Sequence, residues 1–445
     1  MNIINKMRRW VQSLFPIKNI QTALDIDVAL SPEMMGMIDT WQKCWTGNAD
    51  WLNKYTASLR LEKSVTREFA NVVLNEMTAK VSNPKLDKLF QASLKDINEE
   101  FQKGLASGAM VIKPLGGSKV QYVPQSGFIP VEYDVEKRLV KVIFPDFKQF
   151  GDYYYTRLEY HDLDPQKGLT VTNRAFRSST PGSLGKEILL AEVEEWSQFN
   201  SYALYPLMKR PAFGYYRNPI ANTIDGSPAG ISIFETAIET IKKADKQFGR
   251  IEWEFESGER VIHIDEAALR PNKNGKTELP ETFGRLYRGI DIGTDELYKE
   301  FSPAFRQADL LAGLDAYKRE IEFQVGLSYG DISNPQTVDK TATEIKSSKK
   351  RKYNTVTAIQ NNLESCLDDF VYALAFLNQM ATQNYDFICD FKDSVLVDDE
   401  TERTQDRQDV SMGVMPLWEY RMKWYGEDEN TAKTMTSDST AEVVD

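Results

Sequence analysis

The chain has 445 residues, with 54 basic against 66 acidic side chains and a formal net charge of −12. Its length exceeds what one ordinary hydrophobic core holds, so we expect two or more substructures. The acidic balance argues against a protein that coats nucleic acid, because such proteins gain most of their affinity from cations on phosphates, and any contact with DNA should be local.

The first residues predict an amphipathic helix over 3–15 that docks on the fold or on a partner, with a membrane-surface helix as the alternative. The opening lacks the apolar region of a secretory signal. No stretch of about 18 uninterrupted apolar residues occurs, so we expect no membrane-spanning helix. The three cysteines, Cys44, Cys366 and Cys389, form no C-x-x-C pair. They fit a reducing compartment and neither a disulfide framework nor a zinc site.

Helices are predicted in the first quarter of the chain and strands after it. Ser31-Pro32-Glu33 combines a cap, a proline at the first position and an acid in the first turn, so a helix should begin there. Apolar stripes over 65–77 and 86–105 predict further core helices. Past residue 109, β-branched and aromatic runs alternate with charge and are broken by glycine or proline, as in strands and hairpins. The order helices, strands, helices predicts an α+β fold and not a wound parallel sheet.

Two long helices are predicted over 227–258 and 302–326, each opened by Ser-Pro and closed by glycine. At 1.5 Å per residue they would measure roughly 35 to 45 Å. Residues 259–301 between them predict short strands and polar turns. The pattern is typical of a stalk that carries a small tip, and equally of an ordinary helical hairpin with an inserted loop.

A loop rich in turn-forming residues is predicted over 327–340, and a capping box at 341–344 then begins a helix that reaches about residue 380. That helix would be roughly 60 Å long. Its second and third turns hold five cations: Lys346, Lys349, Lys350, Arg351 and Lys352. The helix dipole already makes this end positive, so the cations cost energy unless an anion lies nearby or water solvates them.

No motif for nucleophilic, phosphate-binding or zinc-protease chemistry occurs, so we expect no enzymatic activity and no cofactor. His161 and His263 have no metal-ligand spacing, and we interpret both as strand residues. A metal-dependent nuclease is the main enzymatic alternative, because late carboxylates could hold a divalent ion: Asp386, Asp390, Asp393, Asp398, Asp399 and Glu400. We favour the interpretation that these acids form a solvated polar segment.

Six runs of residues, in this order, span nearly the whole chain: GLASGAMVIKP, YYYTRLEYHD, PLMKRPAFGYYRNPIANTIDGSPAGISIFETAIETIKKAD, FESGERVIHID, KTATEI and DDETERTQDRQDVSMGVMPLWEYRMKWYGEDENTA. Together they resemble the portal proteins of long-tailed bacteriophages, in the portal family typical of phages of Gram-positive hosts. No single run is diagnostic, since none is catalytic, but the ordered set is specific. The C-terminal region is short compared with that family's crown.

The resemblance implies a portal-type fold and a homo-oligomeric ring of about twelve subunits around a DNA channel. Its parts would be a wing (1–226 with the long helix 341–381), a two-helix stem (227–258 and 302–326), a small β-rich clip (259–301), a tunnel loop (327–340) and a short crown with the C-terminal tail (382–445). The implied partners are double-stranded DNA, contacted transiently and without sequence preference, the terminase large subunit, major capsid and scaffolding proteins, and a head-completion adaptor. The place would be the capsid vertex of the virion, after assembly in the host cytoplasm. A monomeric capsid-associated adaptor is a further alternative.

Three groups of candidate site residues follow from this interpretation. Residues expected to face DNA in the channel are Ser328, Tyr329, Asn334, Gln336, Lys340, Lys346, Lys349 and Lys350. Residues expected to dock the motor or connector from the clip are Arg270, Lys273, Lys276 and Arg285. Residues of the stem that neighbouring subunits should cover are Ile231, Phe234, Ile238, Ile241, Leu310, Leu314 and Tyr317.

Two premises support these choices. Apolar residues such as Ile231 and Ile233 lie on more than one face of the predicted stem helix, so a single hairpin should leave some of them uncovered. The cations near residue 346 either contact phosphates in the channel without reading sequence, or pair with acids of a neighbouring subunit. The candidate acids are Glu252, Glu254 and Glu256.

Overall fold

The computed structural model describes residues 17–75, 77–258, 261–265, 287–290, 298–301, 304, 306–335, 342–380, 382, 384–391 and 399–438. Helices and sheets are mixed along this chain, which confirms the predicted α+β class. The helix predicted over 3–15 lies outside the described residues. Within the described part of the chain, no helix has the length and apolar character needed to cross a bilayer.

The described chain opens with helices: α3 (Ile17–Leu24), α4 (Pro32–Thr46), α5 (Leu61–Asn75), α6 (Pro84–Ser93) and α7 (Ile97–Ser107). The start of α4 is the predicted one, because the Ser31 hydroxyl oxygen accepts a hydrogen bond from the Met34 N–H at 3.0 Å. Trp41, Phe69 and Phe101 are fully buried in the main hydrophobic core, which α4, α5 and α7 share. The apolar stripes in the sequence therefore face one core, as expected.

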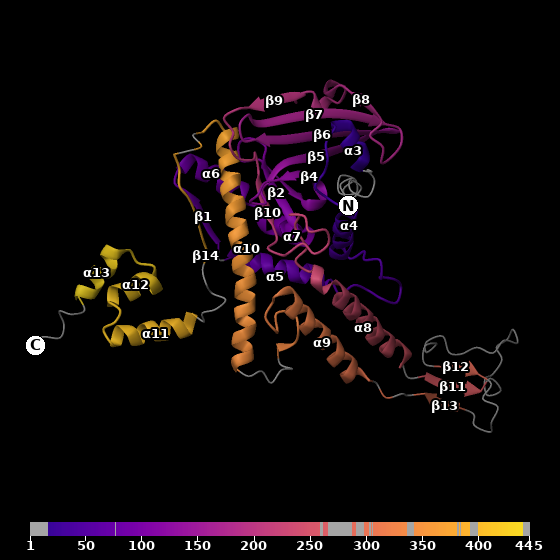
Figure 1. The fold of residues 1–445 in the computed structure, drawn as a ribbon. Helices are drawn as coiled ribbons and strands as arrows, with labels where there is room; N and C mark the ends of the chain where they lie inside the picture. The colour runs from indigo at the N-terminus through magenta and orange to yellow at the C-terminus, as the bar shows by residue number, and fades with distance from the viewer. Residues whose placement is uncertain are drawn as a thin grey trace, which may run out of the picture.

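Two antiparallel sheets form the strand-rich layer. The smaller has the order β10-β2-β3, and the larger has the order β4-β5-β6-β7-β8 with β9 also paired to β7. Their strands are β2 (Ala109–Pro114), β3 (Val120–Pro124), β4 (Ile129–Tyr133), β5 (Leu139–Phe150), β6 (Tyr153–Asp164), β7 (Gly168–Ser178), β8 (Lys186–Ile188), β9 (Tyr202–Tyr205) and β10 (Gly214–Arg217). The larger sheet caps the body at the top of Figure 1, with the smaller sheet beneath it.

One long helix, α10 (Ala342–Leu377), runs along the body beside both β10 and β2 (Figure 1). The approach to β10 is so close that a Cβ on Gly214 would lie 2.2 Å from the Cys366 carbonyl oxygen, so only glycine fits there. The side of α10 that faces the body is fully buried: Ile359, Leu363, Leu367, Phe370 and Leu374. The long helix predicted from the apolar stripe is thus present, and packing against the small sheet holds it.

A two-stranded sheet joins distant parts of the chain. β1 (Met77–Val81) pairs antiparallel with β14 (Phe387–Phe391), and the Ser82 N–H donates to the Asp386 carbonyl oxygen at 2.9 Å. Residues 387–391, which the prediction assigned to the crown, therefore pair with β1 of the body. Three helices follow and pack on one another: α11 (Asp399–Ser411), α12 (Leu417–Tyr425) and α13 (Glu429–Asp438).

The two helices predicted as the stem, called the stem helices below, are shorter than predicted. The first, α8 (Ile238–Ser257), follows a 3-10 turn, η4 (Glu235–Ala237), so a start at residue 227 is wrong. The cause is local: the Ser227 N–H donates to Asp225 Oδ1 at 3.0 Å and Asn222 Nδ2 donates to the Ser227 carbonyl oxygen at 3.1 Å. Ser-Pro here belongs to a turn and does not open a helix. The second, α9 (Gln307–Val325), begins later than residue 302 and ends as predicted at Gly326, where φ is 86°.

The stem helices run antiparallel to each other. At the end near the body, Thr236 Oγ1 donates to the Gln324 carbonyl oxygen at 3.1 Å. At the far end, Arg306 pairs with Glu254 at 2.6 Å. Between the two helices in sequence, a three-stranded sheet forms from β11 (Val261–Asp265), β12 (Tyr287–Ile290) and β13 (Tyr298–Phe301), in the order β12-β11-β13. This sheet lies at the end of the stem away from the body (Figure 1).

Buried acids lie where α8 meets the helices of the body. Glu62 of α5 is 1% exposed, and its Oε2 atom has no hydrogen-bond partner among the described residues. Asp245 of α8 is also 1% exposed and accepts hydrogen bonds from Trp51 Nε1 at 2.9 Å and from the Leu59 N–H at 2.8 Å. Burial raises the pKa of Glu62 to about 7 and also raises the pKa of Asp245. The root of the stem therefore holds a carboxyl group that titrates near neutral pH.

Replacing Glu62 with glutamine should remove a pH dependence of stability. Because the pKa of Glu62 is about 7 in the folded chain and 4.5 without the fold, the folded protein holds the extra proton between these values. Its stabilising effect is complete below pH 4.5 and is lost as the pH rises through 7, by on the order of 3 kcal/mol. Thermal unfolding of both proteins from pH 4.5 to 8 measures this difference. Parallel curves for the wild type and Glu62→Gln would show that folding does not raise the pKa of Glu62.

Candidate functional site

One buried carboxylate organises the loop that follows α9. Glu322 is fully buried near the end of that helix. It accepts hydrogen bonds from the backbone N–H groups of Gly330 at 3.1 Å, Ile332 at 2.5 Å and Ser333 at 2.7 Å, and from the Ser333 hydroxyl at 2.8 Å. Burying a charged group is costly unless donors satisfy it, and here the loop backbone supplies them. The first half of the predicted tunnel loop therefore folds back onto the end of α9 and is held there by these hydrogen bonds.

Two ion pairs of Lys352 in α10 link this loop to α10 and α5. Asp331 Oδ2 accepts from the Ser328 N–H at 2.8 Å and lies 3.1 Å from Lys352 Nζ, which also lies 3.0 Å from Glu68 Oε1. Burial raises the pKa of Asp331, although Lys352 opposes the shift. Burial alone would lower the pKa of Lys352, but Asp331 and Glu68 hold it above its usual value. Lys352 therefore stays charged and bridges the loop and the body.

The five cations at the start of α10 do not act as one group. Arg351 donates to the Leu327 carbonyl oxygen at 3.1 Å, and its guanidinium lies 4.9 Å from the Phe323 ring centre and 5.0 Å from that of Tyr329. Arg351 and Lys352 are thus held within the chain. Lys349 and Lys350 are exposed on α10. Lys346 lies in α10, and its side chain falls outside the described residues.

Other channel candidates lie on the loop itself. Ser328 and Tyr329 take part in the contacts above, and the Asn334 N–H donates to Asp315 Oδ1 at 2.8 Å. Gln336 and Lys340 lie outside the described residues. So do the clip candidates Arg270, Lys273, Lys276 and Arg285. Among the candidates whose side chains are described, Lys349 and Lys350 are the cations that the structure leaves exposed to a ligand.

The stem candidates were predicted to be covered by neighbouring subunits, but all seven are buried or half-buried within the single chain. Ile231 and Ile233 are 2% and 1% exposed in the single chain, so the premise that neighbouring subunits must cover them is wrong. The main core of the body buries them, since 231–234 precede the helix. Four of the seven candidates are buried, Ile231, Phe234, Ile241 and Leu314, and three are half-buried against the same core, Ile238, Leu310 and Tyr317.

Exposed apolar side chains do occur on the stem, at positions that the sequence reasoning missed. Trp253 and Phe255 on α8 are 61% and 44% exposed, and Leu311 on α9 is 43% exposed. All three lie toward the end of the stem that carries the small sheet. The helical spacing of these three residues did not predict that they are exposed, because tertiary packing decides which face of each helix is covered. Glu254, a candidate for pairing with a neighbour, is already paired with Arg306, which holds its pKa below the usual range.

His161 forms no reactive site with its described neighbours, and the side chain of His263 falls outside the described residues. His161 lies in β6 and His263 in β11, as predicted for strand residues. His161 Nε2 lies 2.7 Å from Glu159 Oε1, and Glu159 also pairs with Lys113 and Arg157. Burial would raise the pKa of Glu159, but Lys113, His161 and Arg157 hold it well below its usual range. This buried ion cluster joins the small sheet to the large one and has the character of a structural link.

The acids proposed for metal chemistry do not converge in the described structure. Asp386 and Asp390 are exposed beside and within β14, and the side chains of Asp393, Asp398, Asp399 and Glu400 fall outside the described residues. Throughout the described ranges, no group of three or more His, Cys, Asp or Glu side chains is arranged to hold a metal ion.

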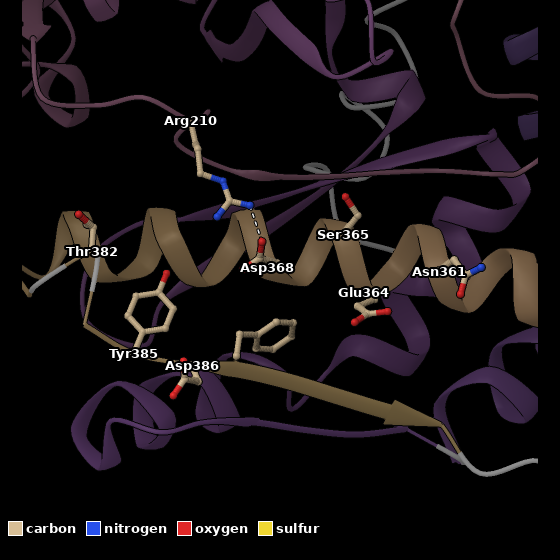
Figure 2. A pocket seen from close by; sticks show the side chains of 9 residues that line it. Arg210, Asn361, Glu364, Ser365, Asp368, Thr382, Tyr385 and Asp386 are labelled. Carbon is tan, nitrogen blue, oxygen red and sulfur yellow. Dashed lines mark hydrogen bonds and ion pairs between the residues drawn. The ribbon is translucent and has the colours of Figure 1, made fainter.

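A cavity of about 560 Å³ lies between α10 and β14 (Figure 2). Arg210 at its edge is bonded to Asp368 at 2.5 Å and to Asp369 at 2.7 Å, so the guanidinium is neutralised by its own chain. The lining combines hydroxyl and carboxylate groups with two aromatic rings: Ser365, Thr382, Glu364, Asp386, Tyr385 and Phe387. No nucleophile paired with a base is present among these residues.

No family model matches the chain, and no curated protein does. Its function is therefore inferred from the fold, the site residues and the resemblance noted in the sequence.

Replacing Glu322 with glutamine should loosen the loop. The substitution keeps the size but removes the charge that four donors share, at a cost of about 2 to 4 kcal/mol. Hydrogen exchange at the amides of Gly330, Ile332 and Ser333 should accelerate, and the thermal midpoint should fall. The matched control is Glu320→Gln, an exposed acid on the same helix, which should change neither. Unchanged exchange at the three amides of Glu322→Gln would show that the carboxylate does not hold the loop.

Proposed function

We propose that the chain is a subunit of a ring-shaped portal at a phage capsid vertex, with no enzymatic activity of its own. The observation that supports this proposal is the stem: two antiparallel helices, α8 and α9, with a three-stranded sheet at the end away from the body (Figure 1). A long helix follows the stem in sequence and runs along the body, as in the portal-type fold that the sequence resembles. The ordered resemblance along the chain adds a second, independent support.

The charge of the chain suits a conduit for double-stranded DNA. At −12 per chain, a ring of about twelve copies would carry on the order of a hundred or more negative charges, which repel DNA from the walls. Weak contact between the DNA and the channel wall would let the DNA move through the ring. Lys349 and Lys350 would then supply a local ring of cations that steadies the duplex through its phosphates without reading sequence.

The proposed partners follow from this arrangement. The sheet at the end of the stem would meet the terminase large subunit during packaging and the head-completion adaptor afterwards. The body would contact major capsid and scaffolding proteins. Trp253, Phe255 and Leu311 are exposed apolar residues near the sheet end of the stem, which such assembly would cover. Assembly would take place in the host cytoplasm and the finished ring would remain in the virion.

Replacing Lys349 and Lys350 together with glutamine tests the channel role. If both side chains face phosphates, native mass spectrometry should show the same closed oligomer of about twelve 50.9 kDa chains for variant and wild type. Phages that carry the variant should package shorter genomes or lose DNA from the head, because the steadying cations are gone.

The matched control changes two exposed lysines to glutamine, Lys167 in the turn between β6 and β7 and Lys186 in β8, and should package normally. Dissociation of the Lys349 and Lys350 variant before any packaging defect would show instead that these lysines pair with acids of a neighbouring subunit. Normal assembly and normal packaging by the variant would show that Lys349 and Lys350 are only solvated surface charges. A wild-type chain that stays monomeric at micromolar concentration contradicts the ring itself.

A further inference from the structure

A second cavity, of about 450 Å³, lies beside α10. Its walls are the turn between β4 and β5, the end of β10, the loop 219–228 and one side of α10. Lys137 comes from the turn, Arg217 from β10 and Asn362 from α10. Ser227 and Asn222 supply polar groups from the loop. None of the described residues that line this cavity is acidic, in a chain whose net charge is −12.

The acids around the cavity already have partners of their own. Glu136 pairs with Arg138 at 2.9 Å, and Asp369 pairs with Arg210 at 2.7 Å. Asp225 accepts hydrogen bonds from the Ser227 N–H, from the Asn222 side chain and from the Ser31 N–H. Lys137 and Arg217, by contrast, form no ion pair with any described residue. The cavity therefore holds two positive charges that the described chain does not neutralise.

Hydrogen bonds hold the Arg217 side chain and the backbone of Lys137, whose side chain is exposed. Asn362 Nδ2 donates to the Arg217 carbonyl oxygen at 2.8 Å, and Arg217 Nη1 donates to the Pro228 carbonyl oxygen at 3.3 Å. This leaves most of the guanidinium donors for a ligand. Lys137 sits in a turn that Asp134 closes, since the Lys137 N–H donates to the Asp134 carbonyl oxygen at 3.0 Å.

The backbone of Lys137 carries a further signal. Its φ is 64°, in the left-handed region where glycine is unstrained and a lysine is not. The turn thus keeps a long cationic side chain at a position where folding alone favours glycine. Residues with backbone strain of this kind cluster at ligand-binding sites, where the side chain is needed to contact the ligand.

We propose that this cavity binds a phosphate group in its dianionic form, as inorganic phosphate or as a phosphate monoester, between Lys137 and Arg217. A phosphate monoester carries about −1.5 to −2 charges at neutral pH, which matches two unpaired cations. Arginine forms paired hydrogen bonds with two phosphate oxygens, and lysine adds a point charge. A phosphodiester carries one charge per phosphate and leaves one cation unpaired. The site is independent of the portal proposal, because it lies within one chain.

Isothermal titration of the full chain with inorganic phosphate, at pH 7.5 and low salt, tests the site. The wild type should bind, and Lys137→Gly should bind about tenfold or more weakly, because one charge-assisted contact is lost. The same substitution should leave the thermal midpoint unchanged or raise it, because glycine relieves the left-handed backbone. Arg217→Gln should weaken binding to a similar extent.

The matched control is Lys119→Gln, an exposed lysine in the turn between β2 and β3, which should bind phosphate like the wild type. Equal affinity of the wild type and Lys137→Gly, or no binding by a folded wild type, would overturn the proposal. A second titration uses a short DNA duplex, which should not displace phosphate. Displacement that requires Lys137 would overturn the assignment to a monoester and give the site to a nucleic-acid backbone.

Discussion

The conformation of the loop after α9, and through it the contacts of that loop with α10, depends on the buried carboxylate of Glu322. A charge with no water around it is stable only when donors surround it, and the loop after α9 can supply those donors only by folding back on the helix. That fold places Asp331 within reach of Lys352, and Leu327 within reach of Arg351, so that stem, loop and long helix become one unit. A change at any of these groups should therefore loosen the contacts of the described part of the loop with α9 and α10.

The same contacts divide a run of cations that is continuous in sequence. Arg351 and Lys352 point toward the loop and α5, where partners hold them, whereas Lys349 and Lys350 are exposed. A helix turns about 100° per residue, so neighbours in sequence need not share a face. The run is therefore part structural link and part free charge. Among the cations whose side chains are described, Lys349 and Lys350 are the ones exposed for the phosphate contact that we propose.

Features that depend on local chemistry could be predicted from the sequence. The start of α4 follows from Ser31 and its proline, the end of α9 from Gly326, and the length of α10 from its apolar stripe. Features that depend on distant residues could not. The pairing of β1 with β14, the burial of Ile233 and the donors around Glu322 arise from contacts that no local pattern encodes. The start of α8 was misjudged because Ser-Pro opens helices and also belongs to turns, and the Asn222 and Asp225 side chains decide between them.

For the candidate site, the sequence located the cations and the loop but not which cations are free. We expect Lys349 and Lys350 to border the opening of a ring, and electron microscopy of the purified protein can show this. The images should contain closed rings of about twelve subunits with a central hole, and a reconstruction should place the start of α10 facing that hole. Single chains without a ring, or rings in which both lysines point to the outer surface, would contradict it.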